Sequence, residues 1–156
     1  DAERQLRAFG RSCGVVVTIL RILGIYASDR PGGHPRERLA RGTPVLRAED
    51  DVYTNHIHAD DLARACVAAL VRGRPQRIVH ACDDTEMTMG DYFSLAARLT
   101  GLPEPRRVSR DEARRELPPM LLSFMSESRR LINRRLTHEL GLRLRYPQVA
   151  QGLVEG

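Results

Sequence analysis

The stretch from Thr54 to Leu70, TNHIHADDLARACVAAL, constrains the fold more than any other part of the sequence. It opens with a short β-like segment in which His56 and His58 flank one apolar residue, and a helix is expected to begin at the acidic pair Asp60 and Asp61. Carboxylates in a first turn accept hydrogen bonds from unpaired N–H groups and oppose the helix dipole. Small apolar residues at helical spacing then predict one face that lies flat on a sheet: Leu62, Ala63, Cys66, Ala69 and Leu70.

Two nearly continuous apolar runs predict strands buried on both faces, as in a parallel sheet. They are Val15–Leu20, which is rich in β-branched residues, and Arg77–Cys82. A helix over Asp1–Ser12 leads directly into the first run, and the helix that begins at Asp60 precedes the second. After the second run, Thr88 can cap a further helix over Met89–Thr100. This alternation of helix and strand is typical of an α/β fold.

The C-terminal third is expected to be mostly helical. Ser109 and Glu112 have the spacing of a capping box, Pro118–Pro119 open a further helix, and Gly141 closes another that starts at Arg134. The segment 101–105 is rich in glycine and proline and is expected to be a linker. We therefore predict an α/β domain over residues 1–102 with an inserted loop at 27–52, and a helical subdomain over residues 103–156.

Composition excludes several classes of protein. The net charge of +5 comes from arginines interspersed with acidic residues, and aromatic residues make up only 4% of the chain, so we predict no nucleic-acid binding. No apolar run approaches the ~20 residues of a membrane span, and no signal-peptide pattern is present. The three cysteines include no C-x-x-C pair, which favours reduced core residues in a cytoplasmic protein.

The sequence shows no familiar catalytic motif: it has no G-x-G-x-x-G, G-x-x-x-x-G-K-[ST], G-x-S-x-G or H-E-x-x-H. His56 and His58 share one strand face and could bind a metal, but no third ligand is evident. A hydrogen-bonded histidine at a strand-to-helix junction is the simpler interpretation of His58, and we predict no metal site. Ligands of open α/β sheets bind at the carboxyl ends of strands, which here favours the loop Ala27–Pro35.

Four motifs in order resemble a known family. They are RILGIY at 21–26, NHIHADDLA at 55–63, IVHACDD at 78–84 and YPQVAQGL at 146–153. Together they are similar to the second half of an extended short-chain dehydrogenase/reductase, the group of NAD(P)-dependent epimerase/dehydratase-like proteins. Residues 120–146 resemble a bacterial subgroup. The resemblance implies the C-terminal part of a Rossmann-type parallel sheet with a mostly helical substrate-binding subdomain.

In that family, the N-terminal half holds the Gly-rich turn for the cofactor and the Tyr-x-x-x-Lys pair for proton transfer. Neither motif occurs here, and the chain has no lysine at all. The resemblance therefore implies a fragment of an NAD- or NADP-dependent enzyme that carries no catalytic residue of its own. By itself such a chain is expected to be inactive and to expose a sheet edge, so it would associate with the missing half or form a homodimer.

The resemblance also implies site residues. The segment after the first strand packs against the nicotinamide in the family, which assigns cofactor contacts to Ile22, Leu23, Gly24 and Ile25. Tyr26 occupies the tyrosine of the family's Tyr-Gly-Pro, Arg30 aligns with a basic residue near the substrate, and His56 stands where relatives often have an arginine. These three are the expected contacts of a small-molecule substrate.

The expected function is the substrate-binding half of an oxidoreductase or epimerase that moves hydride to or from a carbonyl or hydroxyl carbon, with a sugar-nucleotide-like substrate as one option. Two alternatives remain open at this stage. One is a non-catalytic binding module derived from the family. The other is a nucleic-acid-binding protein, whose affinity would fall steeply with salt.

Overall fold

The computed structural model describes residues 1–30 and 32–154. Pro31, within the expected loop 27–52, and residues 155–156, at the end of the expected subdomain 103–156, lie outside the described residues. The helices are α1 (Ala2–Cys13), α2 (Arg36–Ala40), α3 (Ala59–Arg72), α4 (Met89–Thr100), α5 (Arg110–Glu116), α6 (Pro119–Phe124), the π-helix η1 (Arg135–Glu139) and α7 (Val149–Gly152). The strands are β1 (Thr18–Ile22), β2 (Gly24–Tyr26), β3 (Val45–Leu46), β4 (Tyr53–Thr54), β5 (His56–His58), β6 (Arg77–Ala81), β7 (Met87–Thr88) and β8 (Arg107–Val108).

One extended segment, β1 followed by β2, organises the strands. β1 pairs in parallel with β6, and β2 then pairs in parallel with β5. The backbone N–H of Asp83, just beyond β6, donates to the carbonyl of His56 at 2.7 Å. β5 therefore lies between the diverging carboxyl ends of β2 and β6. The α/β character and the parallel pairing confirm the predicted fold class.

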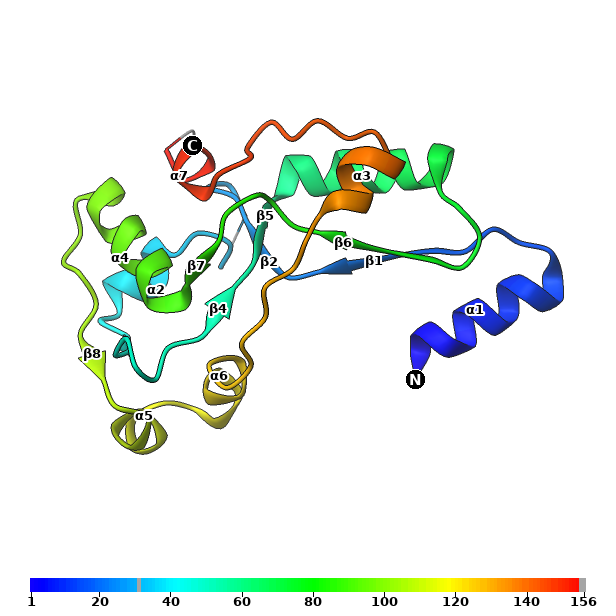
Figure 1. Cartoon of the computed structure of the whole chain (residues 1–156). Coiled ribbons are helices and arrows are strands. Elements are labelled where there is room, and N and C mark those ends of the chain that lie inside the picture. Colours follow the sequence, from blue (N-terminus) through cyan, green and yellow to red (C-terminus); the bar gives the residue numbers. More distant parts are fainter. Residues whose placement is uncertain (31, 155–156) are drawn as a thin grey trace.

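α3 covers one side of the β1–β6 pair and α1 lies on the other side (Figure 1). The start of α3 was predicted correctly, but its buried face was not. Asp61 and Ala65 are fully buried, whereas Cys66 is exposed and Leu70 is 88% exposed. The prediction failed because apolar residues occur on more than one side of this helix, so periodicity alone could not select the side that contacts the sheet.

The first predicted strand is also corrected. The run Val15–Leu20 was expected to be buried on both faces, but pairing begins only at Thr18, and Val15 and Val16 are 47% and 57% exposed. The five residues of β1 itself are half-buried or exposed. Within the described residues β1 pairs along one edge only, with β6, so nothing in this part of the chain covers its other edge.

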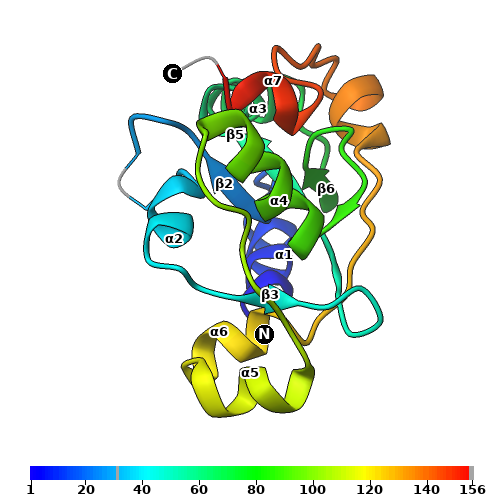
Figure 2. The ribbon, with the colours of Figure 1, turned by 90° about the vertical axis from the view of Figure 1, so that its left-hand side faces the viewer.

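The C-terminal segment returns to the sheet. Leu136, Leu140 and Leu142 are buried against Val79 of β6 and Ala65 of α3. Figure 2 shows α5 and α6, which contact each other, at one end of the molecule and α7 at the opposite end. Residues 103–156 thus include both a separate helical pair and a segment that belongs to the α/β core, and the division at residue 102 stays a prediction.

Local capping signals in the sequence are confirmed. Ser109 and Glu112 form the capping box of α5, and the hydroxyl of Thr88 accepts a hydrogen bond from the Asp91 N–H at the start of α4. His58 caps α3, since its Nδ1 accepts from the N–H of Asp60 at 3.2 Å. The junction role inferred for His58 is therefore confirmed.

The sequence suggested that Asp61 caps its own helix, but in the structure it does not. Its carboxylate accepts the backbone N–H of Arg145 at 2.9 and 3.0 Å and that of Tyr146 at 2.9 Å. Arg64 completes the site with an ion pair of 2.7 Å. A fully buried carboxylate is therefore satisfied by a segment more than eighty residues away in sequence, and it fixes that segment on α3.

We expect Asp61→Ala to destabilise the chain by about 3 kcal/mol or more, because two buried N–H groups and the Arg64 guanidinium lose their partner. Urea unfolding followed by circular dichroism measures the change. Asp60→Ala is the matched control: Asp60 is half-exposed and lies 3.9 Å from Arg145, so its loss should change stability by less than about 0.5 kcal/mol. Equal effects of the two substitutions would contradict the role of Asp61.

Candidate functional site

A cleft with a volume of about 670 Å³, called the main cleft below, lies beside β2 and the amino end of β5. Residues from β2, β5, α2, α4 and α6 contribute to its walls. Six of the seven residues named from the sequence line it, namely Ile22, Leu23, Gly24, Ile25, Tyr26 and His56. The lining includes Ile22, the carboxyl end of the parallel strand β1. The carboxyl ends of parallel strands are the usual ligand-binding edge of an α/β sheet, so the cleft is the candidate functional site.

The two strands approach each other closely at Gly24. The Gly24 N–H donates to the carbonyl of Asn55 at 3.1 Å. A Cβ atom at position 24 would lie 2.9 Å from Cδ2 of the His56 ring, which is closer than real contacts allow. Glycine is therefore needed here so that the imidazole can lie against the backbone of the neighbouring strand.

His56 is a buried imidazole, with an exposed fraction of 6%. Its ring stacks on Tyr92 of α4 with the centroids 3.9 Å apart, and its Nδ1 has no hydrogen-bond partner among the described residues. Burial penalises the charged ring and lowers the pKa of His56 to about 4. The side chain is therefore a neutral hydrogen-bonding group at physiological pH.

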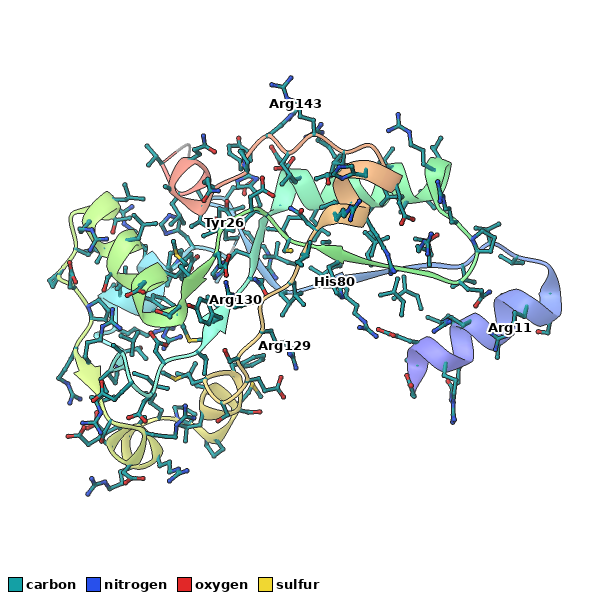
Figure 3. All side chains as sticks on the ribbon, viewed as in Figure 1. Arg11, Tyr26, His80, Arg129, Arg130 and Arg143 are labelled. Atoms are coloured by element: carbon teal, nitrogen blue, oxygen red, sulfur yellow. The ribbon has the colours of Figure 1, made fainter. Side chains whose placement is uncertain are left out.

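Tyr26, labelled in Figure 3, lines the cleft, and its hydroxyl is buried away from solvent. A Cβ atom at Gly152 of α7 would lie 2.6 Å from that oxygen, so the hydroxyl is in close contact with α7. Burial, together with the charge of Asp83, raises the pKa of Tyr26 well above its usual value. Tyr26 is thus a neutral wall of the cleft.

Arg30 is the one residue named from the sequence that the structure does not bring to the cleft lining. Its Nη1 donates to the carbonyl of Ile25 at 3.1 Å, and the side chain is exposed. It supports the backbone of β2 from outside.

Three arginines that the sequence interpretation missed line the cleft: Arg38 and Arg41 from the α2 region, and Arg129 from the coil after α6. Arg129 is paired with Glu127, and Figure 3 shows it on that coil beside Arg130. With so many arginines in the chain, no pattern in the sequence separates these three from the arginines that lie outside the cleft.

Asp83 lies next to His56, because its backbone N–H donates to the His56 carbonyl. Its Oδ1 accepts the N–H of Thr85 at 2.9 Å, and its Oδ2 is buried without a partner in the described part of the chain. Burial raises the pKa of Asp83 to about 7. Sequence reasoning named Asp83 only as part of a motif. Its unusual environment comes from burial, which is visible only in the structure.

Other expectations concern metals and cysteines. In residues 1–30 and 32–154 no group of three or more His, Cys, Asp or Glu side chains could hold a metal ion, and no helix is long and apolar enough to cross a membrane. All three cysteines are free, as predicted, but only Cys82 is buried; Cys13 and Cys66 are exposed, which corrects the expectation of core positions. Their apolar sequence neighbours were a poor guide because burial varies along the chain: Ala65 beside Cys66 is fully buried, whereas Val67 on its other side is exposed.

Comparison with solved structures gives one consistent result. The fold superposes on a functionally unknown conserved protein from Silicibacter pomeroyi with a TM-score of 0.79 and 33% identity, over 98% of this chain and 50% of that one. A nucleoside-diphosphate-sugar epimerase from Pseudomonas aeruginosa gives 0.78 and 24% over the same shares of the two chains. A human epimerase family protein solved with NADPH gives 0.74 and 16%, over 90% of this chain and 48% of that one. No family model matches the sequence, and no curated protein does.

The chain therefore has the α/β fold of half of a Rossmann-type epimerase and spans about half the length of the structures it matches. The matched structures include proteins of the NAD(P)-dependent epimerase/dehydratase type, which confirms the resemblance stated from the sequence motifs.

We expect the His56 ring to stay neutral in NMR titrations from pH 8 down to about 5, because its pKa is about 4. The unfolded chain takes up this proton near pH 6.5, so the His56 contribution lowers stability as pH falls from 6.5 toward 4, by up to about 1.4 kcal/mol per pH unit. An imidazole midpoint near 6.5 in the folded chain would contradict the burial of His56.

His56→Phe is the matched variant for the stability measurement, since a phenyl ring retains the stack on Tyr92 and does not titrate. Urea unfolding of both proteins at several pH values isolates the His56 contribution by difference. The difference is needed because Asp83 acts in the opposite direction: its raised pKa gives stability at low pH that is lost as pH rises through about 7.

Proposed function

We propose that this chain is the substrate-binding half of an NAD(P)-dependent oxidoreductase or epimerase, acting by hydride transfer at a carbonyl or hydroxyl carbon. The observation that carries the proposal is the convergence of residues from β2 and from the amino end of β5 on one cleft beside the carboxyl end of the parallel strand β1. The fold comparison supports the same assignment, since the matched proteins include one solved with NADPH and one solved with UDP-glucose.

The segment Ile22–Ile25 suits the role of nicotinamide wall. It is a run of apolar residues interrupted only by Gly24, it lines the cleft, and Ile22 at its entrance is 43% exposed. A flat ring can pack on such a surface without displacing a polar group. When bound, NAD(P) would supply or accept the hydride.

His56 is the polar group best placed to orient a substrate in this half. The imidazole is neutral, it is fixed by the stack on Tyr92, and it lies against Gly24 in the proposed nicotinamide wall. A neutral imidazole offers one donor and one acceptor, which suits a hydroxyl or carbonyl oxygen. Proton transfer at that oxygen needs a further acid/base pair, which these residues do not supply.

Exposed apolar surfaces support a role as half of a larger assembly. α3 presents a stripe of exposed residues at helical spacing, and α1 and its following loop expose further apolar side chains: Ala63, Cys66, Val67, Leu70 and Val71 on the first, Leu6, Phe9, Val15 and Val16 on the second. We propose that a cofactor-binding half, or a second copy of the chain, covers them.

The test is NADPH binding and hydride transfer. The isolated chain should bind NADPH at least about a hundredfold more weakly than a protein in which residues 1–156 follow a segment with a Gly-rich turn and a Tyr-x-x-x-Lys pair, since the turn provides most pyrophosphate contacts. Fluorescence titration of NADPH measures both proteins. Failure of the longer protein to bind would refute the oxidoreductase assignment and favour the non-catalytic binding module.

A substitution within the chain tests the wall itself. Ile22→Glu in the longer protein should weaken NADPH binding about tenfold, because it places a carboxylate in an apolar contact. Ile132→Glu is the control, since Ile132 is 77% exposed and does not line the main cleft. Equal affinities for the two variants would exclude Ile22 from the cofactor site.

A further inference from the structure

Arg38 carries a positive charge into the cleft without a carboxylate to balance it. None of the described acidic side chains lies within ion-pair distance of its guanidinium. Its Nη2 donates to the carbonyl of Pro44 at 3.3 Å, its Nη1 and Nη2 approach the sulfurs of Met89 and Met125 at 3.9 and 4.0 Å, and its Nε is buried without a partner. Only one of these acceptors is an oxygen, the other two are the weakly accepting thioether sulfurs, and the Nε donor is unused.

The charge persists at physiological pH. Burial, and secondarily the nearby charge of Arg41, lower the pKa of Arg38 to about 10, which is still well above neutrality. Arg41 lines the same cleft, and no partner for its side chain occurs among the described residues. Glu127 is the one carboxylate in the described lining, and Arg129 neutralises it. This end of the cleft is therefore positive.

Aromatic contacts connect Arg38 to His56 across the floor of the cleft. The guanidinium lies 4.3 Å from the centroid of the Phe93 ring, Phe93 meets Tyr92 edge-to-face at 5.2 Å, and Tyr92 stacks on His56 at 3.9 Å. The two rings between the arginine and the histidine offer apolar surface with few groups that could bond to sugar hydroxyls. Met89 and Leu121 extend that surface.

We propose that the cleft binds an anionic substrate with a flat apolar or aromatic body, whose phosphate or carboxylate is held by Arg38. The body lies over Phe93 and Tyr92, and the reacting end reaches His56 and the Ile22–Ile25 wall. This inference rests on the proposed function, because it takes the cleft to be the substrate site, and it narrows the substrate class.

A buried cation without a counterion favours the unfolded state, so Arg38 is not explained as a structural group. Removal of its charge should leave the fold intact or strengthen it, provided that the new side chain replaces the apolar stem of the arginine. An anion would provide the missing partner, and hydrogen bonds that involve a charged group are stronger than neutral ones.

The experiment is isothermal titration calorimetry of the 156-residue chain with phenyl phosphate and with phenylacetate, and with benzyl alcohol as the neutral analogue. At least one anionic probe should bind at least about tenfold more tightly than benzyl alcohol, and the tighter of the two identifies the anion. Inorganic phosphate and UDP-glucose are titrated in parallel. The proposal would be overturned if neither phenyl phosphate nor phenylacetate binds, or if UDP-glucose binds more tightly than both of them.

Two variants test the residue. Arg38→Met should weaken binding of the preferred probe about tenfold or more and leave the melting temperature unchanged or higher. Arg36→Met removes the same charge from the same helix but lies outside the cleft lining, and should change binding less than about twofold. Equal losses in both variants, or a lower melting temperature for Arg38→Met, would overturn the proposal.

Calorimetry needs neither NADPH nor hydride transfer, so its outcome is separable from that of the proposed function. If the longer protein fails to bind NADPH while phenyl phosphate or phenylacetate still binds through Arg38, the oxidoreductase assignment fails and the anion site stands. If NADPH binds and neither aryl probe does, the substrate class fails alone.

Discussion

The position of β5 between the diverging ends of β2 and β6 is the constraint on which the candidate site depends. β2 and β5 pair through only three residues each, and a single bond from Asp83 to the carbonyl of His56 ties β5 to the segment after β6. Such a short strand has little pairing energy of its own. Its place is secured instead by complete burial of Ile57 in the core formed by α3 and β6, and by the stack of His56 on α4. The ligand-facing residues are thus set by packing beneath them.

Asp61 extends the same arrangement toward the C-terminus. By accepting the N–H groups of residues 145 and 146, it fixes the chain that leads into α7, and α7 in turn covers the hydroxyl of Tyr26 near Gly152. One buried carboxylate therefore links the start of α3, the C-terminal segment and the back wall of the cleft. In the acidic pair of the HADD sequence, the second residue, Asp61, makes a tertiary contact, whereas the first, Asp60, is exposed to solvent.

The features that sequence reasoning predicted well are those with a local physical cause. The capping box at Ser109, the cap at Thr88 and the turn at Gly141 depend on residues a few positions apart, and all are present. The family motifs likewise located the cleft walls on β2 and β5. The buried face of α3 and the exposure of Val16 were missed, because burial depends on which neighbours the rest of the chain supplies, and hydrophobicity alone does not identify them.

Arg38 shows the same limit most clearly. In the sequence it is one arginine in the run RERLAR, with the same charge and spacing as its neighbours. Its environment comes from two distant segments and one nearby loop: the aromatic ring of Phe93 on α4, the sulfur of Met125 after α6, and the carbonyl of Pro44 six residues along the chain. These neighbours remove water from the guanidinium without neutralising it, whereas burial keeps His56 uncharged at the other end of the aromatic floor. A cleft with a fixed charge at one end and a neutral hydrogen-bonding group at the other has a direction, and a ligand that satisfies both ends can enter in one orientation only. In the proposed site, the reacting end of the ligand would therefore lie beside Gly24.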